Sequence, residues 1–162
     1  MDMEALAPEI SDYELERGKP IPSLQHALIQ GNLLMQLGVE AMSEYIALPE
    51  LHLALDDRNA VPDVSIFRRS DLDLTVEQIT VATRPLTAIE ILSPTQAIAE
   101  LLAKAGRYFA AGVQSYWLVV PDLRAIAVFN ASEPKKYKYF YNGQNLLDPV
   151  TGADLPVSLL FD

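Results

Sequence analysis

Two short apolar segments of the chain each carry one acidic residue, and this pattern limits the folds open to the sequence. Asp63 follows Pro62 at the head of the segment 61–67, and Glu90 stands inside the segment 86–92. An ionised carboxylate in apolar surroundings is costly unless a partner compensates it. Two carboxylates at neighbouring strand ends can share a divalent cation, because hard ions such as Mg²⁺ take oxygen ligands. A metal-dependent hydrolase is one interpretation; the other is structural, because Pro-Asp also starts strands after turns and a lone Glu can face solvent at a sheet edge.

Length and composition predict a single domain. The chain has 162 residues, of which 50% are hydrophobic and 21% charged, a composition typical of globular domains with one sizeable core. We divide it into an acidic leader (1–20), a core (22–120) and a C-terminal β extension (121–162). The sequence contains no cysteine, which excludes disulfide scaffolds, thiolate zinc sites and cysteine nucleophiles. Neither a basic, apolar start nor an apolar run of membrane-spanning length is present, so we expect a cytoplasmic protein without membrane contact.

The charge balance argues against tight nucleic-acid binding. The net charge is −10, and residues 1–60 hold eleven Asp and Glu against three Lys and Arg, whereas residues 61–162 hold eleven against nine. Binding to phosphates depends on cationic groups, so only local clusters could support it. Taken singly, each cluster is more typical of a solvated face. The clusters are Arg68 with Arg69, Lys104 with Arg107, and Lys135, Lys136 and Lys138.

The hydrophobic pattern predicts an alternation of helices and strands. A helix over 22–38 is capped by Ser23 and stopped by Gly38. Strands are predicted over 44–55, split by Pro49, and then over 61–67, 86–92 and 115–120. A second helix, capped by Thr95, runs to about Ala111, and the segments 124–129 and 136–141 form a hairpin. The order helix, three strands, helix, strand predicts an α/β fold with a mixed sheet flanked by helices and an appended C-terminal β-hairpin.

The second predicted helix carries two stripes. Apolar residues form one stripe, while Glu100 and Lys104 belong to the other at a spacing of four residues. That spacing is typical of an exposed salt bridge worth a few tenths of a kcal/mol, which is the simplest interpretation of both residues. The apolar stripe consists of Ile98, Leu101, Leu102, Ala105 and Phe109.

Four short sequence segments, through their order and spacing, resemble those of a known family. The similarity spans roughly residues 13 to 129 and is to the Uma-type putative restriction endonuclease family of bacteria, within the PD-(D/E)XK nuclease superfamily. The resemblance implies a restriction endonuclease-like core, a metal site and a phosphodiester substrate in DNA. The segments are VPDVSIF, AIEILSPTQ, ELLAKAGRYFAAGV and SYWLVVPD.

Residue by residue, the resemblance assigns roles to matching positions. Asp63 and Glu90 become ligands of Mg²⁺ or Mn²⁺, with the carbonyl of Ile91 as a third. Such a metal would polarise the scissile phosphate and generate hydroxide near neutral pH. One position departs from the superfamily, which expects Lys two residues after the acid, where this chain has Leu92. Lys104 on the following helix is the best replacement, since the family carries a Lys at this distance, with an acidic residue corresponding to Glu100 four positions earlier.

Two further residues match weaker positions of the family. His26 lies near the start of the first predicted helix and could orient a phosphate or a water, although a satisfied, partly buried histidine is the alternative. Glu14 resembles an acidic position of the family's opening segment and could complete the metal shell.

These observations leave two functions open. The first is a metal-dependent endonuclease with weak, salt-sensitive binding of DNA. The second is a nuclease-fold protein of weakened or lost activity that acts in binding or assembly, which Leu92 and the acidic charge favour. A serine hydrolase has little support, because the sequence has no Gly-x-Ser-x-Gly motif. Cleavage of both strands of a duplex requires two sites, so we expect a homodimer, formed through the segment Tyr137 to Tyr141.

Overall fold

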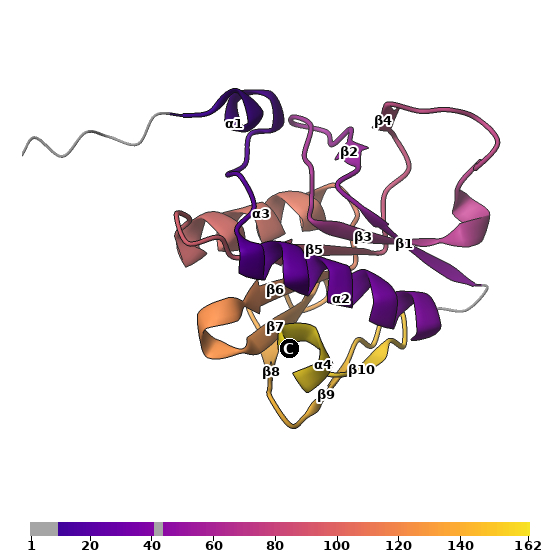
Figure 1. Cartoon of the computed structure of the whole chain (residues 1–162). Helices are drawn as coiled ribbons and strands as arrows, with labels where there is room; N and C mark the ends of the chain where they lie inside the picture. Colours follow the sequence, from indigo (N-terminus) through magenta and orange to yellow (C-terminus); the bar gives the residue numbers. More distant parts are fainter. Residues whose placement is uncertain (1–9, 41–43) are drawn as a thin grey trace, which may run out of the picture.

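The computed structural model describes residues 10–40 and 44–162 and has a mixed six-stranded sheet at its centre (Figure 1). The strand order is β1-β3-β5-β6-β7-β8. Neighbouring strands are antiparallel except β5 and β6, which are parallel and are connected by helix α3. The strands are β1 (Tyr45–Pro49), β3 (Val64–Arg68), β5 (Thr87–Ile91), β6 (Ser115–Val120), β7 (Ala125–Asn130) and β8 (Tyr137–Tyr141).

Helices cover both faces of this sheet. Helix α2 (Leu24–Glu40) and the short α4 (Ser158–Phe161) lie on one face, and α3 (Ile98–Ala110) lies on the other. Helix α1 (Asp12–Arg17) precedes α2 and lies away from the central sheet, at the upper left of Figure 1. Two small strand pairs complete the fold: β2 (His52–Leu53) with β4 (Thr80–Val81), and β9 (Asn145–Leu147) with β10 (Asp154–Pro156). Single-turn 3₁₀ helices follow β3 (Arg69–Asp71) and β6 (Pro121–Leu123).

Strand alternation divides the buried residues into two clusters. Ile89 and Ile91 of β5 face α2, whereas Ala88 of the same strand faces α3. By the period of two, Glu90 shares the α3 face with Ala88. The buried side of α3 consists of Leu101, Ala105 and Tyr108. The predicted fold class, with its helix–three strands–helix–strand core and C-terminal hairpin β7–β8, is therefore confirmed.

Several predicted boundaries were wrong for local reasons. Helix α3 begins at Ile98 and has no side-chain cap, because residues 93–96 first form a turn in which the Gln96 N–H donates to the Ser93 carbonyl at 3.0 Å. Helix α2 continues through Gly38 to Glu40, since Gly38 keeps helical backbone angles instead of the positive φ of a stop. The strand predicted over 44–55 is indeed split after Pro49, where Glu50 takes a φ of 52°.

The apolar stripe of α3 was partly wrong as well. Ile98 and Leu102 are exposed, and Tyr108 takes their place in the core. The sequence pattern missed α1, β9, β10 and α4 in the terminal segments, and the internal strand β4. The predicted leader 1–20 is described only from residue 10. The prediction that residues 1–6 carry no secretory signal concerns residues outside the described ranges. No helix in the described residues is long and apolar enough to span a membrane.

Candidate functional site

The structure brings the two acidic residues of the apolar segments together. Asp63 directly precedes β3, and Glu90 lies in the neighbouring β5. The Ile91 N–H donates to Oδ2 of Asp63 at 2.7 Å, which holds the Asp63 side chain against β5 beside Glu90. Both side chains are almost fully buried, with exposed fractions of 1% and 2%. Two buried carboxylates on adjacent strands need cationic or hydrogen-bonding partners.

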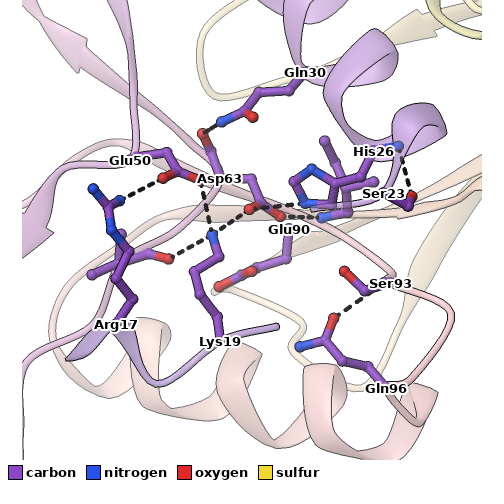
Figure 2. Close-up of polar contacts among 12 residues, drawn as sticks. Arg17, Lys19, Ser23, His26, Gln30, Glu50, Asp63, Glu90, Ser93 and Gln96 are labelled. Atoms are coloured by element: carbon purple, nitrogen blue, oxygen red, sulfur yellow. Dashed lines mark hydrogen bonds and ion pairs between the residues drawn. The ribbon is translucent and has the colours of Figure 1, made fainter. Parts of the chain in front are cut away.

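Asp63 has partners from helix α2 and from the connection between α1 and α2 (Figure 2). Nε2 of His26, in the first turns of α2, lies 3.1 Å from its Oδ1, and the ammonium of Lys19 contacts the same oxygen. Gln30, one helical turn further along α2, donates its side-chain amide to the Asp63 carbonyl at 2.8 Å. Burial by itself raises the pKa of Asp63, but the His26 hydrogen bond and the Lys19 charge outweigh it and hold this pKa below its usual range.

Glu90 receives its partners from α3. The ammonium of Lys104 lies 3.3 Å from Oε1 of Glu90, and the Tyr108 hydroxyl donates to the same oxygen at 2.9 Å. Burial and the neighbouring Asp63 charge raise the pKa of Glu90 against the opposing effect of Lys104. The site thus pairs a carboxyl of lowered pKa with one of raised pKa, an arrangement often found where proteins perform chemistry.

A third carboxylate lies close to this pair. Glu50 follows β1, and its backbone N–H donates to the Asp63 carbonyl at 3.2 Å. Its carboxylate lies 2.5 Å from Arg17, 3.5 Å from Lys19 and 3.4 Å from the Tyr13 hydroxyl, so it anchors α1 to the site. Glu50 and Lys19 were both missed by sequence reasoning. The sequence pattern marks Pro49 as the point where a strand splits and places Lys19 in the leader, and only the fold brings Glu50 and Lys19 to Asp63.

The remaining candidates take the following places. Among the described residues, Lys104 pairs with Glu90 and not with Glu100, which is exposed on α3. Glu14 accepts hydrogen bonds from the backbone N–H and hydroxyl of Ser11 in the capping box of α1. Leu92 is half-buried and packs in the cluster on the α3 side of the sheet.

Most of the basic clusters are engaged in ion pairs. Arg107 pairs with Asp57 at 2.7 Å, Lys136 with Glu133 at 2.6 Å, and Arg68 lies 3.7 Å from Glu44. Within the described ranges, Lys104 is the one member of these clusters that reaches the buried carboxylates.

The family was identified by comparison with known proteins. Residues 2–158 match the family Uma2, described as "Putative restriction endonuclease". The chain belongs to the Uma2 family. A solved structure, titled as a putative nuclease belonging to DUF820 from Anabaena variabilis ATCC 29413, has the same fold with a TM-score of 0.78. It is 24% identical, and the alignment covers 88% of this chain and 83% of that one. A comparison with curated protein sequences gave no significant match.

The family match confirms the resemblance drawn from the four sequence segments, and the structural match confirms the restriction endonuclease-like fold of this Uma2 protein. The match spans almost the whole chain, so the buried carboxylates lie well inside the region that defines the family.

Proposed function

We propose that this Uma2 protein is an endonuclease that uses Mg²⁺ or Mn²⁺ to hydrolyse phosphodiester bonds of DNA, with Asp63, Glu90 and Lys104 as its catalytic residues. The observation that carries the proposal is the burial of Asp63 and Glu90 side by side, with the Lys104 ammonium 3.3 Å from Glu90. Membership in a restriction endonuclease family supports a nucleic-acid substrate.

The donor set suits a hard divalent cation. No group of three or more acidic, His or Cys side chains suited to a metal occurs in the described ranges. Mg²⁺ does not require one, because it is commonly bound by one or two carboxylates and several waters. Asp63 and Glu90 would supply the carboxylates and the Ile91 carbonyl a third oxygen. The hydrogen bonds to Glu90 from Lys104 and Tyr108 both end on Oε1, so Glu90 would offer Oε2 to the metal.

The chain's own residues would hold and orient these groups. A bound divalent cation supplies polarisation of the phosphate and a water of lowered pKa. His26 and the Ile91 N–H fix Asp63, and Tyr108 fixes Glu90, so neither carboxylate must reorganise during the reaction. Lys104 would stabilise the charge that develops on the phosphate, the role that the superfamily gives to a Lys at the position of Leu92. Glu14, His26 and Glu100 are supporting candidates, of which only His26 contacts Asp63.

Binding of DNA would be weak and salt-sensitive. The net charge of −10 opposes approach to phosphates, and Arg68, Arg107 and Lys136 already have acidic partners. On duplex DNA, log affinity falls with log salt concentration at a slope of about −0.9 for every phosphate that the protein neutralises. We therefore expect cleavage to fall steeply with ionic strength.

A homodimer would place two sites on the two strands of a duplex. Strand β8 is at one end of the sheet, and Tyr137 and Tyr141 are more than half exposed on it. Pairing of β8 with its copy would cover this edge. Sedimentation of the wild type beside Tyr141→Lys tests this: a dimer that becomes a monomer supports the β8 interface, and a wild-type monomer contradicts it.

The alternative function, a nuclease-fold protein that binds without cleaving, is favoured by Leu92 in place of the motif Lys. Cleavage of supercoiled plasmid and of single-stranded RNA, with Mg²⁺, Mn²⁺ or a chelator, separates the two. The proposal predicts metal-dependent plasmid cleavage by the wild type that Asp63→Ala abolishes. Absence of cleavage of either substrate by folded wild type would support the binding protein instead.

A further inference from the structure

Lys19 occupies a cation site made entirely of oxygens. Its side chain is 6% exposed, and its ammonium contacts Oδ1 of Asp63, the Val61 carbonyl at 3.3 Å and Oε1 of Glu50 at 3.5 Å (Figure 2). An ammonium has three N–H donors, so these three oxygens satisfy all of them. A buried lysine is costly unless it is paired in this way. Lys19 is therefore the counter-ion of the carboxylate cluster.

A metal at Oδ1 of Asp63 and the Lys19 ammonium would need the same atom. Oδ2 of Asp63 accepts the Ile91 N–H at 2.7 Å and so faces the backbone of β5, and a metal that approaches Asp63 from the other side would take Oδ1. Lys19 and His26 both contact that oxygen. Two cations on one carboxylate oxygen repel each other strongly at low dielectric. Binding of a divalent cation at Oδ1 is thus incompatible with the observed place of the Lys19 ammonium.

The segment that carries Lys19 lies outside the sheet. Gly18 ends α1 at a φ of 65°, and its N–H closes the helix by donating to the Glu14 carbonyl at 2.8 Å. Lys19 then lies in the connection between α1 and α2, outside any strand. Arg17 and Tyr13 hold α1 to Glu50 independently of Lys19. The ammonium can therefore leave Asp63 while α1 stays anchored.

We propose that Lys19 is an exchangeable internal cation: it neutralises Asp63 in the metal-free protein and leaves Oδ1 of Asp63 when a divalent cation binds there. This inference rests on the metal site proposed above. Its consequence is that Lys19 weakens metal binding, so that the protein requires a high metal concentration, and that metal occupancy sets the position of the segment between α1 and α2.

Calorimetric titration with Mn²⁺ tests the exchange. Lys19→Met removes the competing charge and keeps the length of the side chain, so it should bind Mn²⁺ at least tenfold more tightly than the wild type. Lys104→Met is the matched control, because it removes a positive charge beside Glu90 without freeing an oxygen of Asp63, and it should change the affinity by a smaller factor.

Three other outcomes of the titration would contradict the exchange. Equal affinities of Lys19→Met and wild type would overturn the exchange and leave the metal site standing. An equal gain in Lys19→Met and Lys104→Met would also overturn it, because the effect would then be a general one of charge. Folded proteins that bind no Mn²⁺ at all would overturn both the metal site and the exchange.

A measurement on the wild type alone covers the case in which Lys19→Met does not fold. Amine acylation with an N-hydroxysuccinimide ester, read by mass spectrometry, reports the accessibility of each lysine. Lys19 should be protected without metal and react several-fold faster in saturating Mg²⁺. The exposed Lys138 should react equally in both conditions. Labelling of Lys19 that does not respond to Mg²⁺ would overturn the proposal.

Discussion

The ammonium of Lys104 lies 3.3 Å from Oε1 of Glu90, although Glu100 stands one helical turn away on the same helix. This ion pair joins α3 to the strand that precedes it. A residue whose spacing is typical of a surface salt bridge is therefore directed to a buried carboxylate. Tyr108, one turn further along α3, reaches the same oxygen.

Lys104→Met should lower metal-dependent cleavage by about 10²-fold or more, the usual cost of removing one group that stabilises transition-state charge. Initial rates of plasmid cleavage at saturating metal measure the effect. Lys135→Met, which removes an exposed charge outside β8, is the control and should change the rate little. Equal rates for Lys104→Met and wild type would remove Lys104 from the catalytic residues.

Leu92→Lys should be neutral or harmful. Lys104 already lies at Glu90, so a further ammonium would only repeat the charge that Lys104 supplies. Leu92 is also half-buried among apolar side chains, where Lys costs stability. Cleavage rates and the free energy of unfolding, compared with Leu92→Met, check both effects. A rise in rate of tenfold, about 1.4 kcal/mol of barrier, would show instead that the missing Lys limits catalysis.

The fold could be predicted further than the site. Hydrophobic periodicity and the turn residues around each strand locate β3, β5, α3 and β6, because these elements follow local rules. The pairing of Asp63 with Lys19 joins residues 44 positions apart and depends on how α1 returns to the sheet. Glu50 follows β1 with a backbone φ of 52°. No hydrophobic periodicity indicates that its carboxylate reaches Lys19 beside Asp63. Charged residues that meet only in the folded chain leave no local pattern.

The two carboxyls should give opposite pH dependences of stability. The folded-state pKa of Asp63 lies below its unfolded value, so its contribution is present above about pH 4 and is lost as the pH falls through the folded pKa. The folded-state pKa of Glu90 lies above its unfolded value, so stability is lost as the pH rises from about 4.3 through the folded pKa.

Urea unfolding of Asp63→Asn and Glu90→Gln between pH 3 and 8 measures this difference. Asp63→Asn should fall further below the wild type as the pH rises, whereas Glu90→Gln should gain on the wild type over the same interval. The exposed Glu16→Gln serves as control. Parallel curves for the two site variants would mean that burial and pairing do not separate the two carboxyls.

The most direct test of the proposed metal centre is Mn²⁺ binding, followed by calorimetry, in the wild type, Asp63→Ala and Glu90→Ala. Asp122→Ala, in the 3₁₀ turn after β6, is the control because it also removes one acidic charge but lies outside the proposed site. We expect binding by the wild type and by Asp122→Ala, and none by the two site variants, because each removes one of the two carboxylate ligands. Binding that survives in both Asp63→Ala and Glu90→Ala would contradict the metal site and, with it, the proposed mechanism.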